Sequence, residues 1–204
     1  MNDKVYYPWF HCIAGQKRLK FTIMAATTHL MTVEEFRRLP EDRGDTYHEL
    51  HHGELITLTR PKLKHSLIQT NLLFLLKPLA DPSAHVSMEV SFRPSPEHEL
   101  WAADVAYLSA ERFRQVDPED NIQGAPDLVI EVLSPSNTAG EMLDRERICL
   151  VNGAREFWLV DPDRRQVKVS TPDGRTIAYQ SGQQIPLPLF GPVAQVNVDD
   201  VFRY

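Results

Sequence analysis

Apolar and polar positions follow different periods along the chain. Between residues 63 and 79 apolar residues recur at helical spacing, which predicts an amphipathic helix that Pro78 closes. Residues 47–50 and 54–59 alternate around the turn His51-His-Gly53, which predicts an N-terminal β-hairpin. Thr32-Val-Glu-Glu35 has the capping-box pattern of a helix N-terminus, so we expect a short helix there that Pro40 ends.

Strand patterns follow in the middle of the chain, at residues 86–92 and 101–108. Asp127-Leu-Val-Ile-Glu-Val-Leu133 is nearly all apolar and rich in branched residues, which is typical of a strand buried on both faces. No regular structure is predicted for the intervening loop, residues 109–126. A further helix is expected from about Thr138 to Asn152, where Gly153 stops it.

Three more strands are predicted after this helix, at residues 155–160, 166–170 and 176–180. Helices and strands therefore mix along the chain, which indicates a mixed α/β (α+β) fold with a central sheet.

The composition is that of one globular domain. The chain has 204 residues, of which 42% are hydrophobic, enough for one good core. Residues 1–23 show neither helical nor strand period, so we expect a disordered or misassigned extension before a domain at 24–204. The apolar stretch 5–14 is short and precedes its basic run, which is not the order of a signal peptide. Cys12 and Cys149 form no disulfide framework, so a cytoplasmic protein without a membrane partner is expected.

Two acids stand in apolar strands. Glu131 is the only charge inside 128–133, and Asp104 is the only charge in 101–108, where strand period places it on one face with Ala106 and Leu108. An unpaired buried carboxylate costs several kcal/mol, so such acids need a cation, a metal or a proton. The pair predicts a divalent-metal site; the alternative is a solvent-facing acid or the partner of a buried arginine.

The net charge of −6 argues against nonspecific coating of nucleic acid, but it does not exclude a nuclease, which needs only a local basic patch. The candidates for phosphate contact are Arg60, Lys62, Lys64 and His65, followed by Arg145 and Arg147. The alternative is that these residues are solvated surface charges.

His48-Glu-Leu-His-His52 matches the H-E-x-x-H zinc pattern, which works only when both histidines lie one turn apart on a helix. Gly53 and an alternating strand follow at once, so we interpret these histidines as hairpin and turn residues.

Several blocks together resemble the bacterial putative restriction endonuclease-like family, a branch of the PD-(D/E)XK nuclease superfamily. The similar segments are Tyr47-His-Glu-Leu-His-His-Gly-Glu-Leu55, Pro61 with His65, Ala103-Asp-Val105, Gly124-Ala-Pro-Asp-Leu-Val-Ile-Glu-Val-Leu-Ser-Pro-Ser136 and Glu156-Phe-Trp-Leu-Val-Asp-Pro162. The resemblance covers residues 31–204.

The resemblance implies a restriction endonuclease-like mixed sheet flanked by helices, and hydrolysis of DNA phosphodiester bonds with Mg²⁺ or Mn²⁺. It implies metal ligands at Glu49, Asp104, Glu131 and the carbonyl of Val132, with Asp104, Glu131 and Arg145 as catalytic groups. A homodimer that acts on DNA is the expected assembly.

The chain departs from the family pattern at three positions. Arg145 stands where the family has a lysine, Cys149 where a tyrosine is usual, and Ala103 where a proline is usual. Arginine keeps a positive charge but cannot lose a proton to act as a base. The second hypothesis is therefore a catalytically impaired pseudonuclease that serves as a binding or regulatory module.

Overall fold

The computed structural model describes residues 29–40 and 44–204, so the predicted extension 1–23 lies outside the described residues. The helices are α1 (Val33–Phe36), α2 (Leu63–Leu76), the 3₁₀ helix η1 (Lys77–Leu79), α3 (Ala110–Phe113), α4 (Ala139–Val151) and α5 (Val198–Val201). The strands are β1 (Thr46–His51), β2 (Glu54–Thr59), β3 (His85–Arg93), β4 (Trp101–Leu108), β5 (Ile122–Gln123), β6 (Leu128–Val132), β7 (Glu156–Asp161), β8 (Gln166–Ser170), β9 (Thr176–Gln180), β10 (Gln184–Pro186) and β11 (Gln195–Asn197).

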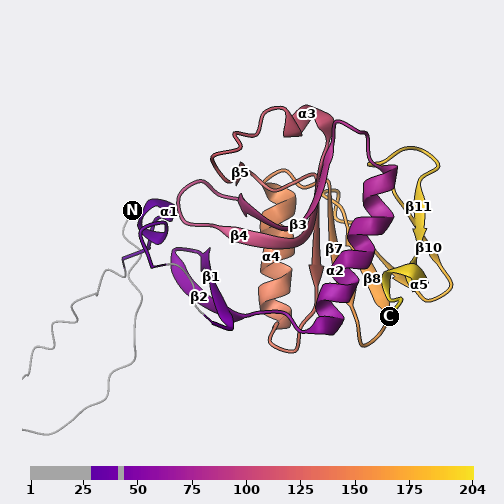
Figure 1. Cartoon of the computed structure of the whole chain (residues 1–204), viewed down its shortest axis with the longest axis horizontal. Coiled ribbons are helices and arrows are strands. Elements are labelled where there is room, and N and C mark those ends of the chain that lie inside the picture. Colours follow the sequence, from indigo (N-terminus) through magenta and orange to yellow (C-terminus); the bar gives the residue numbers. More distant parts are fainter. Residues whose placement is uncertain (1–28, 41–43) are drawn as a thin grey trace, which may run out of the picture.

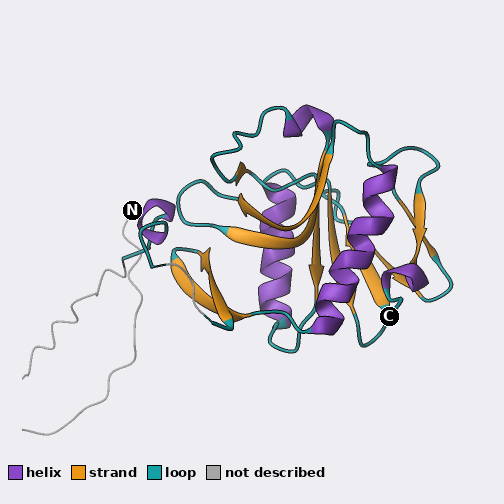
Figure 2. Ribbon diagram, in the orientation of Figure 1, coloured by secondary structure: helices purple, strands orange, loops and turns teal. Residues whose placement is uncertain are grey.

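A seven-stranded mixed sheet forms the centre, in the order β5-β3-β4-β6-β7-β8-β9. Strand β6 pairs antiparallel with β4 and parallel with β7. All five residues of β6 are buried, which confirms the prediction of a strand covered on both faces. Helices flank the sheet (Figures 1 and 2), so the predicted mixed α/β fold is confirmed.

Each face of the sheet has its own apolar core. The first contains the buried face of α2, with Ile68, Leu72 and Leu76, and the C-terminal elements. The second contains Ile148 and Cys149 of α4. The two long helices therefore cover opposite faces, and a side chain's neighbours show which face it lies on.

The helix starts and stops largely follow the predicted signals. Thr32 and Thr138 are the N-caps of α1 and α4, and each forms a capping box with the glutamate three residues later. The α-helical part of the predicted helix 63–79 ends at Leu76, and η1 continues it because Pro78 has no backbone N–H to donate. The loop 109–126 carries α3 and β5, which the sequence analysis did not predict.

The predicted hairpin is β1 with β2, and it delivers Glu49 to the main sheet. Leu50 exchanges backbone hydrogen bonds with Leu100, just before β4, at 3.0 and 2.9 Å. At the turn, Gly53 has φ +74, and a Cβ there would lie 2.7 Å from the Cβ of Leu30, so only glycine fits. The Leu50–Leu100 pair holds the hairpin beside β4 (Figure 1), and the approach at Gly53 packs its turn against Leu30.

Over the described part of the chain, no helix is both long and apolar enough to cross a membrane.

Candidate active site at the acidic centre

Asp104 and Glu131 lie where two neighbouring strands separate. The β4–β6 pairs run from Tyr107–Leu128 to Val105–Ile130 and then stop. The next residues in that register are Asp104 and Glu131. In place of a further backbone pair, Asp104 Oδ2 accepts a hydrogen bond of 2.6 Å from the backbone N–H of Val132. The register thus places the two predicted acids at neighbouring positions where the β4–β6 pairing ends, with Asp104 in contact with α2 and Glu131 in contact with Arg145 of α4.

The predicted face of Asp104 is wrong. Ala106 and Leu108 pack in the core that α4 covers, whereas Asp104 contacts residues of α2. The regular alternation of β4 therefore fails at Asp104. Opposite it, Glu89 of β3 has φ +53, a left-handed conformation that is uncommon for a non-glycine residue and interrupts the regular strand.

Asp104 is held by side chains of α2. Gln69 Nε2 donates to Asp104 Oδ1 at 2.9 Å and also to the carboxylate of Glu89. His65 Nε2 lies 3.2 Å from Asp104 Oδ2 and 3.0 Å from the carbonyl oxygen of Val132. Both of these neighbours are acceptors, so Nε2 carries the proton. One N–H thus contacts two oxygens of the predicted metal site.

Arg145 joins Glu131 to Glu49. From α4, its Nε donates to Glu131 Oε1 at 2.9 Å and its Nη1 donates to Glu49 Oε2 at 2.9 Å. Its Nη2 donates to the carbonyl of Ala102 at 2.6 Å, and the guanidinium lies 4.9 Å from the ring centroid of Trp101. The side chain is only 7% exposed, so this is a buried ion-pair network.

The pKa values of Glu49 and Glu131, the two acids bound to Arg145, shift in opposite directions. Burial raises the pKa of Glu49, but the Arg145 charge and the hydrogen bonds from His51 and Arg145 outweigh burial and lower this pKa to about 2. Burial also raises the pKa of Glu131, and the charges of Asp104 and Glu49 raise it further, so that Arg145 only partly opposes the shift. Glu131 thus resembles a carboxyl group among like charges, whereas Glu49 is a buried carboxylate whose charge is stabilised by a cation and hydrogen bonds.

We call Glu49, Asp104 and Glu131 together the acidic centre. Its oxygen atoms on the Asp104 side suit a divalent ion. Asp104, Glu131 and the carbonyl of Val132 supply the hard ligands that Mg²⁺ and Mn²⁺ prefer. The shared N–H of His65 marks a point that faces both Asp104 and Val132. Within residues 29–40 and 44–204, no three His, Cys, Asp or Glu side chains form a group able to hold a metal. A metal here would therefore rely on two carboxylates and one carbonyl, with Glu49 apart.

Of the remaining residues predicted to contact phosphate, Arg60, Lys62 and Lys64 lie at or near the start of α2, and Arg147 lies on α4. Lys62 is the N-cap of α2 and is exposed. Lys64 Nζ pairs with exposed Asp163 at 3.0 Å, and Arg60 donates to the carbonyl of Gly44. Arg147, on α4, is exposed and pairs with Asp144, so it stays apart from the buried network.

The zinc pattern lies on the hairpin, as interpreted. His48 is in β1, and His52 is in the turn with φ +50, so the two histidines share no helix. His52 Nε2 lies 2.7 Å from Asp144 Oδ2, and its backbone N–H donates to Glu99 at 3.0 Å. These contacts tie the hairpin to α4 and to the segment before β4.

Four contributors to the acidic centre were not predicted from the sequence: Gln69, Glu89, His51 and the backbone of Ala102. Gln69 had a usable signal, because it is a polar residue on the apolar face of the predicted helix 63–79. Glu89 likewise stands in a strand, but nothing in the sequence indicates its left-handed backbone.

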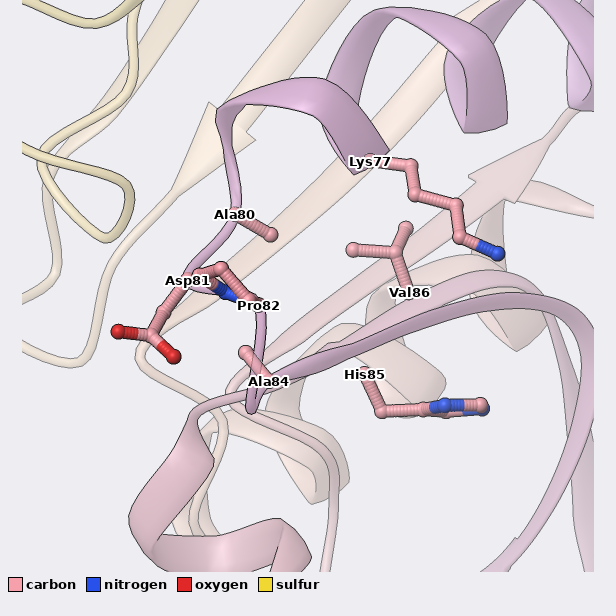
Figure 3. A pocket seen from close by; sticks show the side chains of 7 residues that line it. All are labelled: Lys77, Ala80, Asp81, Pro82, Ala84, His85 and Val86. Atoms are coloured by element: carbon pink, nitrogen blue, oxygen red, sulfur yellow. The ribbon is translucent and has the colours of Figure 1, made fainter.

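A hollow at the far end of α2 is separate from this centre (Figure 3). His85, in its lining, pairs with Leu108, the last residue of β4 and four residues beyond Asp104. Its lining residues are Lys77, Ala80, Asp81, Pro82, Ala84, His85 and Val86.

The pKa of Glu49 predicts how stability changes with pH. Because this pKa falls from 4.5 to about 2 on folding, Glu49 stabilises the fold above about pH 4.5 and loses that contribution as the pH falls toward 2. We expect Glu49→Gln to lower the free energy of unfolding by about 3 kcal/mol at pH 7 and by little near pH 2. The pKa of Glu131 shifts with the opposite sign. Because Glu131 is present in both proteins, the difference in free energy of unfolding between wild type and Glu49→Gln, measured by urea unfolding across pH, reports on Glu49. A difference that is constant with pH would contradict the assignment.

The mixed sheet flanked by helices is a nuclease-like α/β fold. Residues 33–199 match the Uma2 family, described as "Putative restriction endonuclease", and the chain belongs to this family. A crystal structure of a putative nuclease belonging to DUF820, from Anabaena variabilis ATCC 29413, is similar with a TM-score of 0.71 and 26% identity. The match covers 84% of this chain and 97% of that chain. No curated protein matches significantly.

Proposed function

We propose that this chain hydrolyses phosphodiester bonds of DNA in a metal-dependent reaction at the acidic centre. The observation that carries the proposal is the placement of Asp104 and Glu131 at neighbouring positions where the β4–β6 pairing ends, with Asp104 bonded to the backbone N–H of Val132. Membership in a family described as putative restriction endonucleases supports DNA as the substrate. A homodimer in the cytoplasm remains the expected state of the protein.

Asp104, Glu131 and the Val132 carbonyl would hold Mg²⁺ or Mn²⁺. When bound, such an ion supplies an acidic water molecule and neutralises charge on the phosphoryl oxygens. The protein's own part is to orient these ligands: the Val132 N–H and Gln69 fix both oxygens of Asp104. His65 holds the Val132 carbonyl at 3.0 Å.

Lys62 and Lys64 flank the site at the start of α2, within three residues of His65. Neither is buried, so both ammonium groups can meet a DNA phosphate, and the N-terminal end of α2 adds partial positive charge. Local positive charge of this kind lets a protein of net charge −6 approach a polyanion.

A second function, a pseudonuclease that binds without cutting, is favoured by Arg145. Its Nε, Nη1 and Nη2 all donate to protein oxygens, and the side chain is buried. A guanidinium held this way has no clear path to a phosphate, and it cannot serve as a base. Arg145 is better described as a positioning residue for Glu131 than as a group that touches substrate.

The test of the proposal is nicking of supercoiled plasmid by the full chain in Mg²⁺, Mn²⁺ or EDTA. Metal-dependent conversion to open circle, absent in EDTA, is the expected result. No conversion in either metal, together with retention of plasmid in a gel-shift assay, would instead support the pseudonuclease.

A further inference from the structure

The guanidinium of Arg145 lies between Glu49 and Glu131, two of the three acids that the family resemblance implies as metal ligands. It is a planar fork, and it contacts Glu131 through Nε and Glu49 through Nη1. A guanidinium stays protonated in proteins. The positive charge between the acids is therefore permanent.

Both carboxylate oxygens of Glu49 already have hydrogen-bond partners. Its Oε1 accepts a hydrogen bond of 2.8 Å from the backbone N–H of Ala102. Its Oε2 accepts from Arg145 at 2.9 Å and lies 2.6 Å from His51 Nε2. The residue is 3% exposed, so a metal could bind it only by breaking buried charge-assisted hydrogen bonds.

Asp104 differs from Glu49 in the hydrogen-bond partners that a bound metal ion would displace. Its oxygens accept from the Gln69 amide and the Val132 N–H and lie 3.2 Å from one imidazole nitrogen of His65, and none of these partners is a guanidinium. The side chains of Asp104 and His65 are 16% and 14% exposed. Replacing one imidazole contact costs less than extracting a buried arginine from two carboxylates, so a metal is expected on the Asp104 side.

We propose that Arg145 is a resident counter-cation that removes Glu49 from metal binding in this chain, leaving divalent ions to the Asp104 side alone. The proposal rests on the proposed function only for the position of that ion. A lysine at this position has one ammonium group and cannot bond Glu49, Glu131 and the Ala102 carbonyl in a fixed fork. The arginine therefore converts an acid that could bind metal into a structural ion pair.

The test is a cycle of Mn²⁺ affinities by calorimetry, with wild type, Glu49→Gln, Arg145→Lys and the double variant. In the arginine background, Glu49→Gln should change Mn²⁺ affinity by less than about threefold, because Glu49 is not a ligand. In the lysine background the same change should weaken Mn²⁺ binding by about tenfold or more. Arg147→Lys, two residues along α4 and exposed, is the matched control and should behave as wild type.

Loss of about tenfold in Mn²⁺ affinity on Glu49→Gln in the arginine background would overturn the proposal, as would a lysine background in which Glu49→Gln has no effect. A wild type that binds no Mn²⁺ while Arg145→Lys gains Glu49-dependent binding would refute the metal on the Asp104 side and uphold the role of Arg145. If Arg145→Lys does not fold, the comparison of Mn²⁺ affinity between wild type and Glu49→Gln decides the test alone. The Nε–H signal of Arg145 in ¹H–¹⁵N spectra should persist unshifted at saturating Mg²⁺, and its displacement would reject the proposal.

Discussion

Replacing Arg145 by alanine is expected to lower the free energy of unfolding by about 3–5 kcal/mol at pH 7. The change leaves Glu49 and Glu131 buried without their shared cation and leaves the Ala102 carbonyl without its donor. Uncompensated buried charge is among the few causes of such large losses from one substitution. Urea unfolding followed by circular dichroism measures the effect.

Arg147→Ala is the control for this loss, because Arg147 lies on the same helix but its side chain is 63% exposed. Its ion pair with Asp144 is expected to contribute less than about 1 kcal/mol. If Arg145→Ala were as stable as Arg147→Ala, the buried network would not hold the centre together. Adding Glu49→Gln to Arg145→Ala should recover part of the loss, since one of the two stranded charges is then removed.

Asp104→Asn is expected to reduce plasmid nicking by about 100-fold or more, because it removes the charge of a proposed metal ligand while keeping the shape of the side chain. The asparagine oxygen can still accept from the Val132 N–H, so the separation of β4 and β6 should survive. The measurement is the initial rate of open-circle formation in Mn²⁺, with circular dichroism to confirm folding.

The control for Asp104→Asn is Asp163→Asn, in which an exposed acid that pairs with Lys64 loses its charge. This variant should cut at least as well as wild type, because one negative charge near the start of α2 is removed. Equal rates for Asp104→Asn and wild type would show that the cutting, if any, occurs elsewhere on the protein.

Most of the sheet and both long helices follow from local patterns in the sequence. The alternation on either side of Gly53 and the capping box at Thr138 each signal one element without help from distant residues. The C-terminal strands β10 and β11 were missed because each has only three residues, too few to show a period, and their pairing joins residues 184–186 to 195–197. Pairing across such a gap is decided by packing.

The candidate acids could be identified from sequence because charge inside an apolar strand is costly. Glu131 is buried with Arg145 beside it, which is also the alternative left open for such an acid, the partner of a buried arginine. The face of Asp104 could not be predicted, because it depends on the irregular pairing opposite Glu89. Strand period assumes a regular strand, and here the strand is irregular at the residue of interest.

The contacts of Glu49 could not be predicted from the sequence either. Its metal-ligand role was implied by resemblance, and nothing local shows that Arg145, 96 residues later, reaches the same oxygen as His51. Only the three-dimensional arrangement reveals that one cation already serves two of the three predicted acids. The metal site itself remains a prediction.

The central claim is that Arg145 holds Glu49 while a metal ion binds on the Asp104 side. Its most direct test is the anomalous difference density of crystals soaked in Mn²⁺. The expected result is Mn²⁺ bound by Asp104, Glu131 and the Val132 carbonyl, with Arg145 still donating to Glu49. Mn²⁺ bound to Glu49 with Arg145 displaced, or an absence of Mn²⁺ at Asp104 in crystals of a protein that nicks DNA, would contradict it.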